Sequence, residues 1–462
     1  MMKNKLLRVL FLAVFGAAGF YLFKSWDVFR EKTSFKVDEI QYSQAAIDVK
    51  EVKTAFKEPV WFVKTDNPMV CFNIIFKNEG NRSFHKTPGL LTIVLSTLIE
   101  GAGSRDSIAY KKLLNEKATS ININSTSDDL VVSVSCLERY LDVAIELLCD
   151  VLSKAHLKKE KLEISKQGLV TSISQAQFDT DEKAAEKMNA VLYPEEHPYR
   201  SQHATVLKKI PTYTKKDADD CYAKMFDPSN AVVTIVGNLD ESQIVEACKT
   251  IYESISHKKN DFKDVKQETK LRKSGVNVHV PLENPQSTVM FVMPGVSKAS
   301  NERFAVTVAN MILGAVGFNS RLLKSLRDKD GLVYRISSTV MNLDMQAAIS
   351  GSAKTRPENT AKAIKKVKEV VATFFKDGVT QEELDTVKTM VFSNDVTGST
   401  EATLGYVSSC REKGVPRDEV DKYYHHFFNL SLEEVNSAVK KYFDPSTLNF
   451  VSCGEFSKEK KK

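Results

Sequence analysis

The chain has 462 residues, 42% of them hydrophobic, and a formal net charge of +6. The charge lies at the ends, since Met1–Arg8 and Lys458–Lys462 each contribute +3 and the rest of the chain is neutral. This composition excludes wholesale disorder, and the balanced body argues against a nucleic-acid groove. Seven scattered cysteines without a C-x-x-C pair argue against a disulfide framework and a cysteine-type zinc ribbon.

Residues 1–30 predict an export signal or membrane anchor. Val9–Phe23 is uncharged and mostly apolar, and three basic residues precede it. The bulky run Phe20–Phe23 makes a poor cleavage site, so we expect an uncleaved anchor, although a full span needs about 20 residues. The positive-inside rule then puts the body on the periplasmic side of a bacterial inner membrane, or in the periplasm if the signal is cleaved. A mitochondrial location is the alternative.

A repeat organises the rest of the chain. Phe226-Asp-Pro-Ser, followed by an apolar run to Gly237, recurs as Phe443-Asp-Pro-Ser with a run to Gly454, so both landmarks recur after 217 residues. Helical patterns precede the two copies, at 214–224 and 431–441. Several features at one offset and in one order predict duplicated halves of ordinary domain size.

Within each half, β-rich runs alternate with one-sided helical patterns. Strands are predicted at 70–76, 131–135, 232–236, 289–293 and 332–340, and helices at 137–153 and 361–376. Gly103-Ser-Arg and Asn319-Ser-Arg are each expected to open a helix, and Ser431 with Glu434 matches a capping box. This alternation predicts helices covering a sheet in each half.

The charged, apolar-poor stretch 257–273 indicates a solvated linker between the halves. The predicted order is an anchor (1–30), a linker (31–45), a first domain (46–256), the charged linker (257–273), a second domain (274–456) and a basic tail (457–462).

Motifs in both halves then point to a family. They are Pro88-Gly-Leu-Leu, Leu98-Ile-Glu-Gly, His197-Pro-Tyr, the run from Asn230 to Gly237, Leu313-Gly, Ser320-Arg-Leu and, most specifically, Leu326-Arg-Asp-Lys-Asp-Gly-Leu-Val-Tyr. Over about residues 45–455 the chain resembles the insulinase/pitrilysin/mitochondrial processing peptidase family of zinc peptidases. The resemblance implies an α+β fold of two tandem homologous domains, each a mostly antiparallel sheet covered by helices, forming one half of a clamshell.

The family's catalytic motif is missing. In an H-x-x-E-H motif, two histidines on one helix face hold zinc and the glutamate acts on its bound water. The resemblance aligns those positions with Thr92, Leu95 and Ser96, and a third, carboxylate ligand with Ser172. These side chains cannot form a zinc site at neutral pH. We expect this chain to bind no metal cofactor and the zinc to lie in a partner subunit.

The resemblance also implies roles for Arg327 and Tyr334. Arg327 ends a predicted helix, Tyr334 begins the next strand, and Gly331 suits the sharp turn between them. Both side chains donate hydrogen bonds, so they can hold a scissile carbonyl and stabilise its oxyanion. The alternative is an arginine paired with a neighbouring aspartate and a tyrosine packed in a sheet. Gly314 and Gly317 fall where the family can carry a substrate-binding loop.

These features predict the zinc-less subunit of a heterodimeric metalloendopeptidase, inactive alone. Its expected partners are a zinc-bearing homologue, unfolded peptides and, through residues 1–30, a membrane; nucleic acid is not expected. A purely structural paralogue, a peptide-binding chamber without cleavage, and a self-sufficient peptidase with another site remain alternatives.

Overall fold

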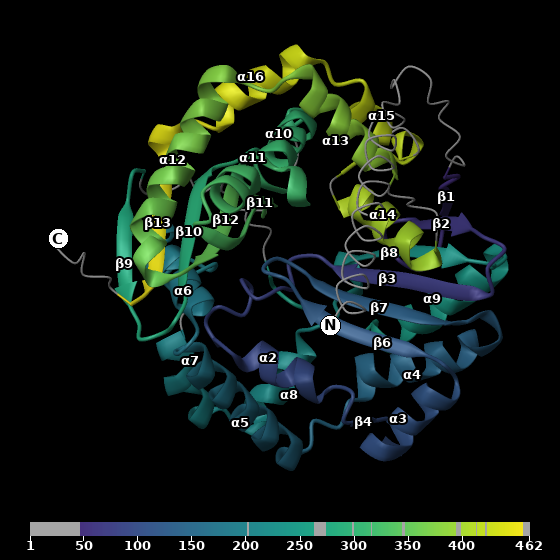
Figure 1. Ribbon diagram of the computed structural model, residues 1–462. Coiled ribbons are helices and arrows are strands. Elements are labelled where there is room, and N and C mark those ends of the chain that lie inside the picture. Colours follow the sequence, from purple (N-terminus) through teal and green to yellow (C-terminus); the bar gives the residue numbers. More distant parts are fainter. Residues whose placement is uncertain are drawn as a thin grey trace, which may run out of the picture. The chain divides into compact units, whose positions relative to one another are not determined.

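The structure is a computed structural model (Figure 1) that describes residues 47–200, 203–262, 274–297, 300–315, 317–343, 347–393, 399–412, 414–420 and 423–455. These residues belong to one compact unit. The predicted anchor and the basic tail lie outside them. Within the described ranges, no helix is long and apolar enough to cross a membrane.

The described residues form two large sheets. The first has the strand order β1-β2-β8-β3-β7-β6 and the second the order β11-β12-β10-β13-β9 (Figure 1). The strands of the first are β1 (Lys50–Val52), β2 (Val60–Lys64), β3 (Met69–Phe76), β6 (Ser120–Ser125), β7 (Leu130–Leu137) and β8 (Ala231–Gly237). Those of the second are β9 (Asn277–Pro281), β10 (Ser287–Pro294), β11 (Val333–Asn342), β12 (Ala347–Thr355) and β13 (Asn449–Gly454). A short hairpin of β4 (Gly101–Ala102) and β5 (Arg105–Asp106) stands apart.

The two sheets share one topology. Reading β2-β8-β3-β7-β6 against β9-β13-β10-β12-β11, each strand has a counterpart at the same place in chain order. In both, the first pair is parallel and the other three are antiparallel. The predicted fold class, two homologous and mostly antiparallel halves, is confirmed.

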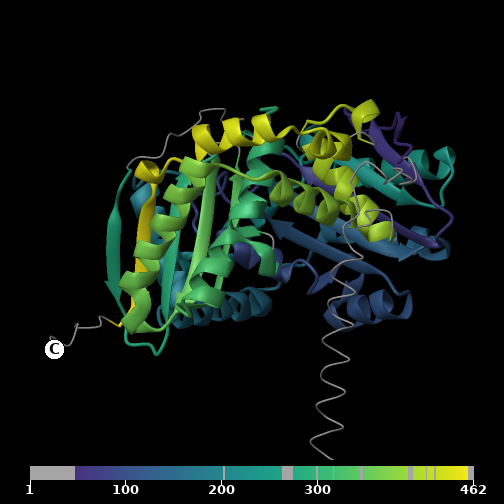
Figure 2. The same ribbon diagram turned by 45° about the horizontal axis from the view of Figure 1, so that its top comes forward.

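Helices accompany each sheet. The first half contains α2 (Leu90–Thr97), α3 (Ser107–Glu116), α4 (Leu141–Lys154), α5 (Lys159–Ala176), α6 (Thr180–Leu192), α7 (His203–Lys209), α8 (Lys215–Ala223) and α9 (Glu241–Ile255). The second contains α10 (Arg303–Asn310), α11 (Arg321–Leu323), α12 (Thr360–Asp377), α13 (Gln381–Ser393), α14 (Thr400–Glu412), α15 (Tyr423–Phe428) and α16 (Leu432–Tyr442). In the turned view of Figure 2, the green helix α12 lies across the second sheet, which it contacts through β10.

The sequence repeat corresponds to a repeated turn. Thr214 and Ser431, 217 residues apart, each cap the helix that follows through a capping box. Asp227 and Asp444 then each accept a hydrogen bond from the backbone N–H of a serine two residues on, at the start of a 3₁₀ turn before β8 and β13. Satisfying these N–H groups fixes the same entry into the strand twice.

One helix of each half packs on the sheet of the other half. Helix α6 packs on β10 and β13, and α14 packs on β3 and β8 (Figure 1). Side chains alternate along β3 accordingly: Phe72 and Ile74 belong to the first core, whereas Cys71 belongs to the core of the second half and the Asn73 amide donates to Ser408 of α14. Burial on both faces explains why these strands are nearly continuous apolar runs.

Three local predictions differ from the structure. The helix expected from Gly103-Ser-Arg begins only at Ser107, because Arg105 lies in the hairpin strand β5 and Asp106 caps the helix by accepting from Ala109 N. The segment before Gly331 is a π-helical turn, Lys324–Lys329, rather than an α-helix. The helix predicted from residue 137 begins at 141, because strand β7 and a 3₁₀ turn occupy the residues before it.

The charged linker is not solvated where it begins. Lys258 is 4% exposed, its ammonium donates to the Tyr222 carbonyl at 2.8 Å, and it lies 3.5 Å from the centre of that ring. Asn260 donates to the carboxylate of buried Glu79 at 2.7 Å. Long polar side chains can bury their stems and bind backbone groups, which a composition count cannot detect.

Candidate functional site

Helix α2 carries the positions where the family's zinc motif would lie. Gly89 is the N-cap residue directly before it, with a left-handed φ of 83° that favours glycine. Thr92 and Ser96 are exposed and Leu95 is half-buried. The Ser96 hydroxyl donates to the Ile93 carbonyl at 2.9 Å, within its own helix. The helix therefore presents hydroxyl and methyl groups where a metal would need histidine and carboxylate ligands.

Helix α5 packs against α2 and carries Ser172, which is exposed. Within the ranges that the structure describes, no three histidine, cysteine, aspartate or glutamate side chains gather closely enough to hold a metal ion. Thr92, Leu95, Ser96 and Ser172 together offer no imidazole, thiolate or carboxylate, so they do not fit zinc.

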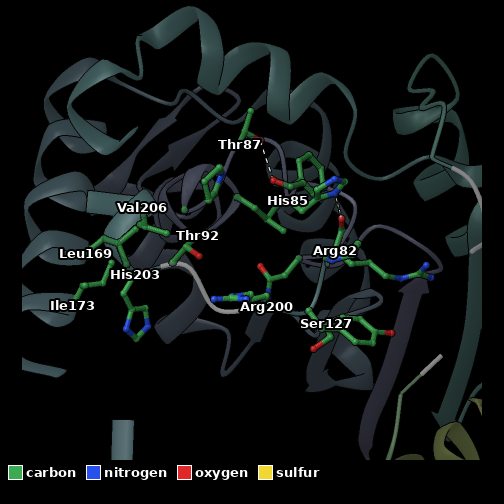
Figure 3. A pocket seen from close by; sticks show the side chains of 17 residues that line it. Arg82, His85, Thr87, Thr92, Ser127, Leu169, Ile173, Arg200, His203 and Val206 are labelled. Atoms are coloured by element: carbon green, nitrogen blue, oxygen red, sulfur yellow. Dashed lines mark hydrogen bonds between the residues drawn. The ribbon is translucent and has the colours of Figure 1, made fainter. Parts of the chain in front are cut away.

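A pocket of about 380 Å³ lies beside α2 (Figure 3). Thr92 lines it, and so does Ile173, the residue after Ser172. Its remaining lining is Asn81, Arg82, Phe84, His85, Thr87, Pro88, Gly89, Leu91, Ser127, Leu169, Pro198, Tyr199, Arg200, His203 and Val206. Sequence reasoning missed this pocket, because its arginines and histidines come from separate segments without a recognisable spacing.

His197 has a structural role in the loop beside this pocket. Its ring stacks on Tyr193 with 4.6 Å between ring centres, and its carbonyl accepts from Arg200 N at 2.9 Å. Burial lowers the pKa of His197. The stacking and the backbone hydrogen bond give His197 a structural place in this turn.

Arg327 and Tyr334 flank one tight turn. Gly331 has φ of 59°, its N–H donates to the Arg327 carbonyl at 3.0 Å, and Leu332 N donates to the Leu326 carbonyl at 2.7 Å. These two bonds close the end of the helical segment in the way a left-handed glycine allows. Strand β11 starts directly after the turn, at Val333.

Tyr334 lies at an irregularity in strand β11. The register with β12 shifts between Val333 and Arg335, and the Tyr334 side chain is 55% exposed. A bulge of this kind redirects a side chain out of the regular alternation. Arg327 is also exposed. The alternative of a tyrosine packed within the sheet does not hold, whereas the structure does not test a catalytic role for either residue.

The two glycines of the predicted substrate loop differ. Gly314 is buried in a π-helical turn, Met311–Ala315, and an added Cβ would lie 2.3 Å from the Ser338 hydroxyl. Its small size allows close packing against β11, and its substrate role stays a prediction. Gly317 is exposed, with nothing within 4 Å of an added Cβ, and its substrate role stays a prediction.

The comparisons with known proteins agree with this arrangement. Residues 212–391 match the family profile described as the peptidase M16 inactive domain. The missing zinc ligands and the duplicated fold agree with this match. The chain is M16-like, and its family match covers residues 212–391. It is a homologue that lacks the zinc motif of the peptidases.

Both a non-peptidase homologue and a zinc protease are among the relatives similar to this M16-like chain. The "non-peptidase homolog YmxG" of Helicobacter pylori is 24% identical over 85% of this chain and 90% of its own length. An uncharacterized zinc protease of Streptomyces coelicolor is 22% identical over 67% of this chain and 68% of its own. Identity at this level leaves open whether the M16 chain shares an activity with either.

Solved structures share the fold. A peptidase M16 inactive domain from Pseudomonas fluorescens has a TM-score of 0.82 at 23% identity, covering 88% of this chain and 98% of that one. A protease from Helicobacter pylori has a TM-score of 0.76 at 17% identity, covering 88% and 100%. The periplasmic protease PqqL of Escherichia coli has a TM-score of 0.73 at 16% identity, covering 92% of this chain and 49% of that one.

Proposed function

We propose that this M16 homologue is the zinc-less subunit of a heterodimeric metalloendopeptidase and supplies Arg327 and Tyr334 to a site whose zinc is held by a homologous partner. The exposed Tyr334 at the β11 bulge carries the proposal, because the bulge leaves its side chain 55% exposed, where the hydroxyl can donate a hydrogen bond to a ligand. The lack of zinc ligands at Thr92, Leu95 and Ser96 supports a division of labour between two chains.

In this proposal Arg327 and Tyr334 act only as hydrogen-bond donors. The Arg327 guanidinium and the Tyr334 hydroxyl would donate hydrogen bonds to the oxygen of the scissile carbonyl, on which negative charge develops during peptide hydrolysis. Neither residue needs to exchange a proton for this role. The two backbone hydrogen bonds that close the turn at Gly331 support the proposal, because oxyanion stabilisation requires donors held in place before the substrate binds.

The test is reconstitution with a homologue that carries H-x-x-E-H. Mixed with it, the chain should support chelator-sensitive cleavage of an unfolded peptide. Tyr334→Phe should lower turnover by roughly 10²–10³-fold, the usual loss for an oxyanion donor. Tyr140→Phe is the matched control, since it removes one tyrosine hydroxyl in the other half. Equal rates for both variants would contradict the proposed role of Tyr334.

A non-cleaving role is the second candidate. It is favoured by the Helicobacter pylori relative, described as a non-peptidase homologue and matched over 85% of this chain. In that case the duplicated fold would bind peptides or support an assembly, and Arg327 and Tyr334 could be replaced together without loss of binding. Peptide binding that survives the double replacement, with no cleavage in any mixture, would identify this role.

The proposal also places the chain outside the cytoplasm, held at a membrane by residues 1–30. The periplasmic description of the Escherichia coli protease of similar fold is consistent with that location. Carbonate extraction of membranes is the check: the full chain should stay in the pellet and a version starting at residue 46 should not. A full chain released by carbonate would argue against the anchor.

A further inference from the structure

We propose that the pocket beside α2 binds the C-terminal carboxylate of a peptide whose last side chain is apolar. Thr92, which the resemblance aligns with a zinc ligand, lines the pocket, and so does Ile173, the residue after Ser172. This inference goes beyond the proposed function, because it concerns binding by this chain alone and uses neither Arg327 nor Tyr334.

The charge of the lining favours an anion. Arg82, His85, Arg200 and His203 line the pocket, and no aspartate or glutamate is among the lining residues. One nearby carboxylate, Glu186, lies 3.9 Å from His203 Nδ1 and offsets part of the charge when that histidine is protonated. Arginine and protonated histidine only donate hydrogen bonds, so a ligand must supply acceptors.

Arg82 forms a fixed wall of the pocket. It is 3% exposed, and its Nε lies 2.8 Å from Asp128, which also accepts a hydrogen bond from the Tyr199 hydroxyl. His85 Nδ1 bonds the Arg82 carbonyl at 2.6 Å, and this holds its ring at the pocket. Because Asp128 neutralises Arg82, the negative charge of the ligand must be neutralised mainly by another residue.

Arg200 is the group best placed to meet that charge. One of its N–H groups donates to the Tyr193 carbonyl at 3.1 Å, and the side chain is half-buried. A guanidinium has five N–H donors in a planar fork, so it can hold a carboxylate while keeping that bond. The hydroxyls of Thr92 and Ser127 line the same pocket and add neutral donors.

The opposite side of the pocket is mostly apolar, with the His203 ring beside its aliphatic side chains. Figure 3 shows Leu169, Ile173 and Val206 on one side and Arg82 and Ser127 on the other, with Thr92 and Arg200 between them. A volume of about 380 Å³ lies near the lower limit of ligand sites and suits one terminal residue. A carboxylate next to an apolar side chain is the chemistry of a peptide C-terminus ending in leucine or valine.

The test uses the full chain and a fluorescein-labelled hexapeptide that ends in leucine. Fluorescence anisotropy should show binding of the free acid and at least about tenfold weaker binding of the C-terminal amide, because the amide loses a charged acceptor. Arg200→Gln should weaken the free acid by a similar factor. Thr92→Val, an isosteric change on an exposed helix position, should weaken it by a few-fold.

Arg139→Gln is the matched control, since it removes an arginine charge from residues outside the pocket and should leave binding unchanged. Melting curves that match the parent chain show that each variant is folded, and Thr92→Val serves if Arg200→Gln is not. Equal affinity for acid and amide, or full affinity in folded Arg200→Gln, would overturn the inference. So would displacement of the probe by inorganic phosphate with no preference for the acid, which would make this a general anion site.

Failure of this inference and failure of the proposed function give different results. Tyr334→Phe should leave binding of the free-acid hexapeptide unchanged even if it abolishes cleavage in the heterodimer. Conversely, a chain that binds the acid and never supports cleavage would retain this inference and lose the heterodimer proposal.

Discussion

Arg411 joins the two halves, and Arg411→Met is the most direct test of that connection. The arginine lies on α14 of the second half, and its guanidinium donates to the carbonyls of Val233 and Pro59 in the first half. It also lies 5.1 Å from the centre of the Trp61 ring. Methionine keeps much of the apolar stem over that ring and removes both donors.

The expected cost follows from these contacts. A hydrogen bond from a charged donor contributes about 1.5–3 kcal/mol to stability, and a carbonyl left without a donor costs a comparable amount. Burial also lowers the pKa of Arg411, to about 10, so the charge is partly desolvated and its removal recovers some free energy. Because the side chain is half-buried and loss of its charge recovers part of the desolvation cost, we expect a net loss of about 2–4 kcal/mol in the free energy of unfolding.

Urea unfolding, followed by circular dichroism and by tryptophan fluorescence, measures this loss. The control is Arg356→Met, which removes an exposed arginine whose ion pair with Glu358 spans 3.3 Å. Such a surface pair contributes about 0–1 kcal/mol. If the Arg411 and Arg356 variants unfold at the same urea concentration, the hydrogen bonds from Arg411 do not stabilise the connection between the halves.

Two further outcomes are expected. Burial raises the pKa of Glu79 from 4.5 to about 8, so the folded state binds a proton more tightly than the unfolded state. The free energy of unfolding should therefore fall as the pH rises from about 4.5 to about 8. Urea midpoints at pH 5.5 and 7.5 should differ less in Glu79→Gln than in the parent, and an equal difference would contradict this. Gly331→Ala should lower the free energy of unfolding by about 1 kcal/mol, because φ is 59° and an added Cβ would make no new contact within 4 Å. Gly331→Asn should lower it less in the same urea assay. Equal stability of the two variants would argue against backbone strain as the cause.

The sequence predicted the duplicated fold because its signals are local. The Phe-Asp-Pro-Ser turns and their capping boxes depend on hydrogen bonds between residues two or three apart, and these recur in the structure at Asp227 and Asp444. Gly331 likewise indicated its turn, since few other residues adopt a left-handed conformation. The M16 resemblance was then confirmed by the family comparison.

The pocket and the buried polar groups could not be predicted in this way. Arg82 and Arg200 are brought together by packing of α2, α5 and the loop after α6, and no periodicity relates them. Lys258 belongs to a charged run typical of exposed segments, and its burial is explained by tertiary contacts such as those with the Tyr222 ring and carbonyl. The π-helical turn before Gly331 has the same apolar spacing as an α-helix over so few residues.

The exchange of α6 and α14 between the sheets has a thermodynamic consequence. Either half made alone would expose an apolar sheet face that the other half's helix normally covers: Val292 and Val451 without α6, or Cys71 and Val236 without α14. Each half is therefore an incomplete folding unit, and their covalent connection in one chain raises the effective concentration of one half near the other. Two separately made halves should therefore become soluble only when they are produced together.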